Sequence, residues 1–140
     1  MRVGIVGAEA AKFTPETQAA ARALIRSRLS PGDVVVSGKC HLGGIDIWAI
    51  EVAKELGLDY TEYPPAYLSW ERGYKPRNIQ IARDSDQVIC VTVRELPPNY
   101  VGMRFDYCYH CHTNEHVKSG GCWTVKYAKS IGKEGHVLVV

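Results

Sequence analysis

The chain alternates between two patterns of apolar and polar positions. Short, mostly apolar runs at residues 2–7, 33–38, 87–93 and 136–140, together with the tyrosine-containing segment 58–64, predict five strands. The longer segments between them carry apolar residues at helical spacing and predict helices at about residues 15–29, 45–57, 75–86 and 121–131. Apolar strands that alternate with helices are typical of a parallel sheet covered on both faces.

Local signals at the ends of these segments support the same order of elements. Thr14 is placed to cap the first helix, and Pro15 suits its first position because the missing N–H has no helical partner there. The apolar positions expected on this helix are Ala19, Ala20, Ala23, Leu24 and Leu29. We expect an α/β, three-layer Rossmann-like fold with a central parallel sheet of about five strands. One domain would cover residues 1–140, with a Cys/His-rich insertion at about 94–118.

Composition narrows the function classes. The 140 residues are 46% hydrophobic and 23% charged, which is ordinary for a globular domain. A formal net charge of +2 argues against a protein that coats nucleic acid. No apolar run reaches the ~20 residues of a membrane span, and no secretion signal precedes the first strand. We therefore expect a cytoplasmic protein with no membrane partner.

Glycine-rich loops occur at three places that the fold would bring to one edge of the sheet. They are residues 7–10 after the first strand, 38–44 after the second, and 118–124 at the start of the last helix. Bare backbone and free N–H groups at helix N-termini bind anions such as phosphate. The candidate ligand-binding residues are Gly7, Ala8, Gly38, Gly43, Gly44, Asp46, Arg77, Asn78, Lys118, Ser119, Gly120, Gly121 and Thr124.

Several of these residues have a simpler structural interpretation. Gly43 and Gly44 would equally suit a tight turn, and Asp46 suits the first turn of a helix as well as a ribose hydroxyl. Arg77 opposes the helix dipole in its first turn, which favours an anionic partner. Trp123 would either stack on a base or fill the pocket. Plain capping is the alternative for three polar residues, Asn78, Ser119 and Thr124.

Three motifs, taken together and in their order along the chain, resemble the SLOG superfamily. They are the loop 37–46, the pair Arg77-Asn78 and the Gly-Gly-x-x-Thr element at 120–124. These Rossmann-like proteins include LOG, DprA and YspA-like members. The resemblance implies a sensor or carrier that binds a nucleotide or nucleotide-derived ligand at the carboxyl edge of the sheet. It also implies pairing into a homo-oligomer, for which the aromatic stretch 60–74 is a candidate interface, or else a lid.

The alternative function is that of a nucleotide N-glycosidic hydrolase or transferase related to the LOG phosphoribohydrolases. Those enzymes have Gly-Gly-x-Gly-Thr followed by glutamates, whereas here Trp123 replaces the glycine and residues 125–127 carry no acid. Glycosidic cleavage needs a carboxyl group to activate water or stabilise the sugar cation. Glu9 and Asp46 are the candidate catalytic residues.

A second cluster of chemistry lies in the insertion. Cys108-x-x-Cys111 matches half of a zinc site, and the other half would come from His110, His112, His116 and Cys122. The set Cys108, Cys111, His116 and Cys122 resembles a zinc knuckle, except that the last gap in this chain is one residue longer. His112 is the alternative ligand. We expect structural zinc, because the insertion has little apolar content of its own. Nucleic-acid binding by this segment is a weaker alternative.

Overall fold

The computed structural model of the protein describes residues 1–105 and 107–140. Its strands and helices alternate along the chain, as the sequence pattern predicts. The strands are β1 (Arg2–Gly7), β2 (Val34–Gly38), β3 (Asp59–Tyr63), β4 (Gln87–Thr92) and β5 (Glu134–Val139). The α-helices are α1 (Pro15–Ser27), α2 (Ile45–Glu55), α3 (Lys75–Asp84) and α4 (Gly120–Ser130). Two short helical turns, η1 (Ala10–Lys12) and η2 (Trp70–Tyr74), precede α1 and α3.

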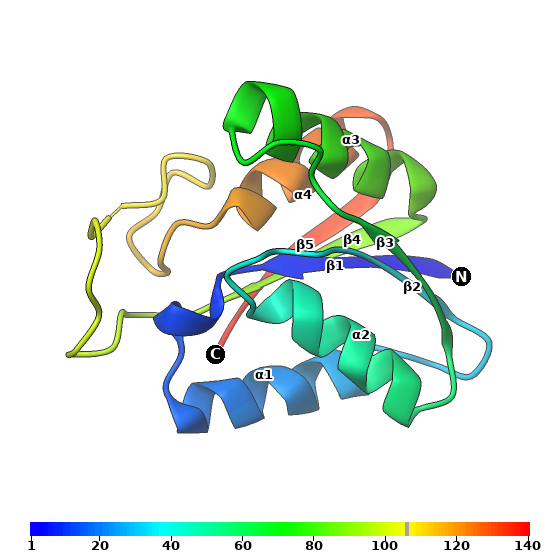
Figure 1. Ribbon diagram of the computed structural model, residues 1–140, viewed down its shortest axis with the longest axis horizontal. Helices are drawn as coiled ribbons and strands as arrows, with labels where there is room; N and C mark the ends of the chain where they lie inside the picture. The colour runs from blue at the N-terminus through cyan, green and yellow to red at the C-terminus, as the bar shows by residue number, and fades with distance from the viewer. Residues whose placement is uncertain (106) are drawn as a thin grey trace.

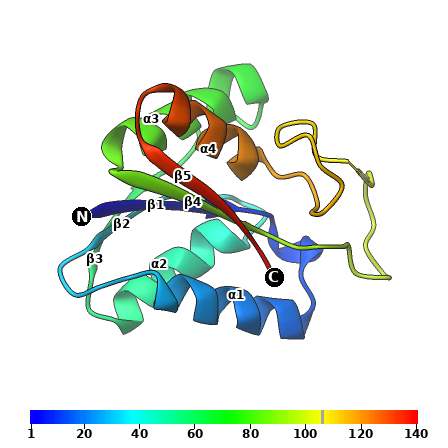
Figure 2. The ribbon, with the colours of Figure 1, turned by 180° about the vertical axis from the view of Figure 1, so that it is seen from behind.

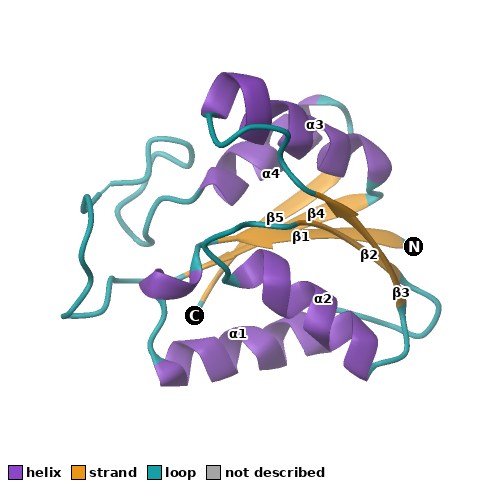
Figure 3. Ribbon diagram, viewed as in Figure 1, coloured by secondary structure: helices purple, strands orange, loops and turns teal. Residues whose placement is uncertain are grey.

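The five strands form one parallel sheet in the order β3-β2-β1-β4-β5. Helices α1 and α2 cover one face, and α3 and α4 cover the other (Figures 1 and 3). The view from behind shows β5 at the opposite edge from β3 (Figure 2). The prediction of a three-layer, Rossmann-like α/β fold is confirmed.

Alternation of side chains along the central strands divides the core into two layers. Val3 and Ile5 of β1 pack toward α1 and α2 in one buried cluster, whereas Val6 belongs to a second cluster with residues of α3 and α4. Strand β4 divides in the same way, with Ile89 in the first cluster and Cys90 in the second. Burial on both faces explains why these strands are apolar throughout.

Helix α1 begins as its sequence predicts, but it buries different residues. Thr14 is the N-cap: its side chain accepts a hydrogen bond from the Thr17 amide at 3.1 Å, and the Thr17 hydroxyl accepts one from the Thr14 amide at 2.8 Å. The buried face is carried by Ala21 and Ile25, one helical turn apart. The expected apolar positions Ala19, Ala20 and Ala23 are exposed, which corrects the prediction. A run of alanines is apolar on every side and does not mark one face.

The segment between β4 and α4 has no helix or strand among its described residues. A single antiparallel bridge joins Cys108 and Thr113, and the far end returns to the sheet where the Val117 amide donates to the Val93 carbonyl at 2.8 Å. Figure 1 shows this segment extending beyond the carboxyl edge of the sheet. Among the described residues, no helix combines the length and the hydrophobicity needed to cross a membrane.

Candidate functional site

A pocket of about 320 Å³ lies at the carboxyl edge of the sheet. It is formed around the end of β1, next to β4, where the strand order reverses direction; open α/β sheets bind their ligands at such points. The pocket brings together the following predicted ligand-binding or catalytic residues: Gly7, Ala8, Glu9, Asp46, Arg77, Asn78, Ser119, Gly120 and Gly121. All three glycine-rich loops therefore contribute to one cavity, since Cys40 and Leu42 of the second loop line it too.

The other candidates lie elsewhere, and the structure shows why. Thr124 is buried in α4, where its hydroxyl lies 3.4 Å from the Gly120 carbonyl. The Lys118 ammonium lies 4.3 Å from the Phe105 ring centre and donates to the Tyr109 hydroxyl at 3.1 Å. It therefore points into the insertion, away from the pocket lining.

The glycines of the second loop serve the packing of the protein itself. Gly44 has a φ of 91°, and a side chain there would collide with the Ala8 carbonyl. Gly38 leaves the space that Arg77 and Asp46 occupy. Gly43, with a φ of 71°, completes the turn. Gly43 and Gly44 follow the tight-turn interpretation, and none of the three glycines is among the residues that line the pocket.

The first turn of α4 forms one wall of the pocket. Ser119 is the N-cap, and its side chain accepts a hydrogen bond from the Gly121 amide at 3.0 Å. Gly121 packs against the end of β1, while a side chain at Gly120 would meet no atom within 4 Å. Amides in a first helical turn have no intrahelical acceptor. Gly120 therefore presents accessible backbone and the positive end of a helix dipole to the cavity.

Lys12, at the end of η1, is the lysine that lines the pocket. Its ammonium lies 3.4 Å from the Lys118 carbonyl, just before the α4 cap. Burial lowers the pKa of Lys12, because the charged form loses hydration. The sequence analysis missed this residue. It is the only basic residue in the loop after β1, and that position was the available signal.

Asp46 and Arg77 form a buried ion pair beside the cavity. Arg77 Nη1 lies 3.5 Å from Asp46 Oδ2, and both side chains are less than 10% exposed. Burial raises the pKa of Asp46 to about 6, although the Arg77 charge and the Cys40 amide act in the opposite direction. Arg77 also donates through Nε to Asn78 Oδ1 at 2.8 Å. The Arg-Asn pair is thus held in place by contacts within the protein.

The lining of the pocket also includes aromatic side chains. Trp70 and Tyr74, from η2, line it together with Leu42. Trp70 meets Trp123 edge-on at 5.1 Å between ring centres, and Trp123 stacks on Tyr127 at 5.4 Å. Trp123 is not among the lining residues. It packs against Trp70 and thereby helps to hold the Trp70 ring at the cavity.

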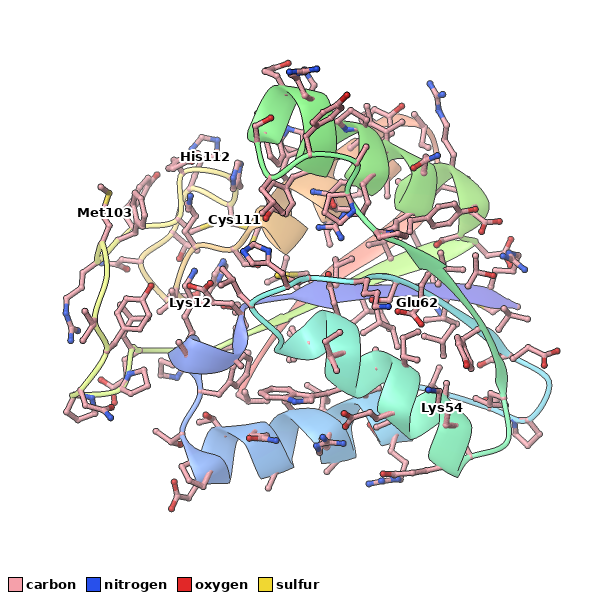
Figure 4. All side chains as sticks on the ribbon, in the orientation of Figure 1. Lys12, Lys54, Glu62, Met103, Cys111 and His112 are labelled. Carbon is pink, nitrogen blue, oxygen red and sulfur yellow. The ribbon has the colours of Figure 1, made fainter. Side chains whose placement is uncertain are left out.

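The predicted metal ligands come together. The donor atoms of Cys108, Cys111, His116 and Cys122 all lie within 4.8 Å of one another, so the group could hold a metal ion. Cys122 belongs to the first turn of α4, and its sulfur lies 3.7 Å from His116 Nε2. In Figure 4, Cys111 lies near the start of α4, and His112 lies on an outer loop of the insertion. The alternative ligand His112 is not part of the group.

Burial disfavours the charged forms of three of these side chains, Cys111, His116 and Cys122. It raises the pKa of Cys111 to about 12 and lowers the pKa of His116. The pKa of Cys122 is raised as well, first by its hydrogen bond with Cys90 and then by burial. An ion would have to displace the thiol protons, and the charge of the ion supplies the driving force.

Comparison of the chain with models of known families, with curated proteins and with solved structures found no match. The resemblance to the SLOG superfamily therefore stays a prediction, and the function rests on the geometry of the pocket and the cluster.

Proposed function

We propose that the pocket binds a nucleotide or a nucleotide-derived ligand, and that the protein acts as a sensor or carrier of it. One observation carries the proposal: a single cavity joins the N-terminus of α4, the Lys12 ammonium and the aromatic wall of Trp70 and Tyr74. The helix end and the lysine suit a phosphate group. The aromatic side chains suit a flat, weakly polar base.

The size of the cavity favours a small ligand. Small-molecule pockets span roughly 300–1,000 Å³, and this cavity of about 320 Å³ lies at the lower end. One nucleotide fits that range better than a dinucleotide. Asp46 and Asn78 also line the cavity, and these are the side chains that we propose for ribose hydroxyls.

Calorimetric titration with nucleoside 5′-monophosphates, the matching nucleosides and inorganic phosphate tests the proposal. Lys12→Met should weaken monophosphate binding by about 10- to 150-fold, because a hydrogen bond to a charged group contributes about 1.5–3 kcal/mol. It should leave nucleoside binding nearly unchanged. Lys118→Met is the matched control, since the Lys118 ammonium donates to the Tyr109 hydroxyl and Lys118 does not line the pocket. Absence of binding at millimolar concentrations, or a larger loss in Lys118→Met, would contradict the proposal.

A second candidate is the N-glycosidic hydrolase or transferase. The observation in its favour is that Glu9 lines the same pocket, with its carboxylate 3.4 Å from the Tyr100 hydroxyl. Asp46 is the other carboxyl group there, but it is already paired with Arg77. Chromatography of nucleotides incubated with the protein would detect a released base. Release that Glu9→Gln abolishes would favour the enzyme, whereas binding without release would favour the sensor or carrier.

We also propose that the Cys₃His group holds structural zinc. Three sulfurs and one imidazole nitrogen complete the tetrahedral set that zinc prefers in closed sites. Elemental analysis of purified protein should give one zinc per chain. His116→Asn should lose the ion, and His112→Asn should keep it. Equal zinc contents in the two variants would contradict the assignment.

Assembly, location and nucleic-acid binding stay predictions from the sequence. Native mass spectrometry tests the expected homo-oligomer, and fractionation of cells tests the cytoplasmic location. Filter binding at low salt tests the weaker alternative of nucleic-acid binding by the insertion, whose affinity should fall steeply with added salt.

A further inference from the structure

The cluster and the pocket share one turn of helix. Ser119, Gly120 and Gly121 line the pocket, and the next residue, Cys122, places its sulfur in the cluster. Cys122 is 1% exposed and belongs to the buried cluster that also contains Cys108, so its side chain anchors this turn in the core. Any force that positions the Cys122 sulfur therefore also positions the amides of the pocket wall.

The insertion has few other means of holding its shape. Among its described residues, the buried ones are Pro97, Cys108, His116 and Val117. Two of these four belong to the cluster. An ion would therefore link the interior of the insertion directly to α4, at bond lengths of about 2.0–2.3 Å.

Two further contacts reach from the insertion to pocket residues. The Tyr100 hydroxyl lies 3.4 Å from the Glu9 carboxylate. The Lys118 carbonyl, at the end of the insertion, lies 3.4 Å from the Lys12 ammonium. A displaced insertion would thus alter the cap of α4 and the surroundings of both charged groups at once.

We propose that metal occupancy of the Cys108, Cys111, His116 and Cys122 cluster fixes the α4 wall of the pocket and thereby controls ligand binding. The control of ligand binding rests on the proposed function, but the fixing of the wall does not. With the ion bound, the insertion and α4 form one rigid unit. Without it, the thiols and the imidazole have only weak contacts to replace four metal bonds. Linkage requires the effect to be reciprocal, so bound ligand tightens metal binding by the same factor.

Hydrogen exchange provides the direct test. We expect chelation of the metal to reduce protection of the Gly121 and Cys122 amides, while amides of β1 and β4 keep theirs. The affinity for adenosine 5′-monophosphate, measured on the same samples, should fall by about 5- to 150-fold, the usual range of such coupling. Added zinc should restore both.

Matched variants distinguish an effect of losing the ion from an effect of the chelator itself. His116→Asn should reproduce the metal-free behaviour and His112→Asn that of the wild type, because His112 lies outside the cluster. Cys111→Ser removes a second ligand and should resemble His116→Asn. Unchanged α4 protection and affinity after metal loss would overturn the inference. Loss of protection throughout the sheet would also overturn it, because the metal would then stabilise the whole fold.

The two proposals fail in different ways. If the zinc-loaded protein does not bind adenosine 5′-monophosphate or inorganic phosphate, the proposed function is overturned. Exchange at Gly121 and Cys122 then still decides whether the ion fixes the wall. If the stripped protein binds the probe as tightly as the loaded one, the inference is overturned and the proposed function stands.

Discussion

Adding one methyl group at two adjacent glycines of α4 should have opposite effects. At Gly121, a Cβ atom would lie 2.7 Å from the Cys90 sulfur and 3.0 Å from the Gly7 amide nitrogen. At Gly120, it would meet no heavy atom within 4 Å. Gly121→Ala therefore tests the close packing of α4 on β1, and Gly120→Ala is the matched control.

The size of the effect follows from what can move. Gly7 belongs to β1, the central strand, and Cys90 is a short, fully buried side chain of β4. Neither can give way freely, so overpacking should cost about 1–3 kcal/mol. At about 4 °C per kcal/mol for a chain of this size, the Tm should fall by about 4–12 °C. Gly120→Ala should leave the Tm unchanged or raise it, because alanine favours helix by up to about 1 kcal/mol.

Calorimetry and urea unfolding of zinc-loaded samples measure both variants. The urea m-value should not change, because the surface exposed on unfolding stays the same. A Gly121→Ala protein as stable as the wild type would refute the close approach of α4 to β1. Equal destabilisation by both substitutions would show that glycine is needed there for backbone conformation instead. Nucleotide binding adds a second readout, since the new methyl group of Gly120→Ala lies in the cavity lining and should weaken binding without lowering stability.

Other predictions concern the buried ion pair, the cap of α1 and the aromatic wall. The pKa of Asp46 is about 6 against an ordinary 3.8, so the folded state binds the proton more tightly. Its contribution to stability is present below pH ~4 and lost as pH rises through ~6, a change of about 3 kcal/mol. Asp46→Asn should remove this slope from urea unfolding measured across that range, and parallel curves would refute the assignment. Thr14→Ala should lower the free energy of unfolding by about 1 kcal/mol, while Thr14→Ser should retain most of it, because only the hydroxyl caps the helix; equal losses would argue against the cap. Trp123→Leu should weaken binding of a nucleotide more than binding of inorganic phosphate, because it frees Trp70 to move; equal weakening of both would count against a base site at Trp70.

The order of the elements and the members of the Cys₃His group could be predicted because both are local properties. Strand and helix periods repeat within a few residues, and the Thr14-Pro15 signal needs no distant partner. The four cluster residues lie within 15 positions of the chain. Cys108-x-x-Cys111 closes a tight loop, and few other thiols or imidazoles lie within reach of it, so chain length alone restricts the choice.

Lys12 and Lys118 show that local sequence patterns do not predict the direction of a long side chain. The placement of loops at the carboxyl edge led to the prediction of Lys118 and missed Lys12, yet Lys12 is the lysine that lines the pocket. A lysine side chain is long enough to turn either way, and Lys118 turns toward Phe105 and Tyr109. Contacts with residues of the insertion decide its direction, and no periodicity encodes them.

The glycines also show the difference between what the sequence predicts and what packing decides. Backbone pattern and residue type were enough to predict a Rossmann-like layer order, a glycine-rich rim and a Cys₃His group. Whether a given glycine accommodates a ligand or a neighbouring chain depended on packing: Gly38 makes room for Arg77 and Asp46, and Gly121 for β1, while Gly120 is open. Short-range preferences are set by each residue and its near neighbours. The direction of a side chain, or the space beside a Cα atom, is set by segments that meet only after the sheet has formed.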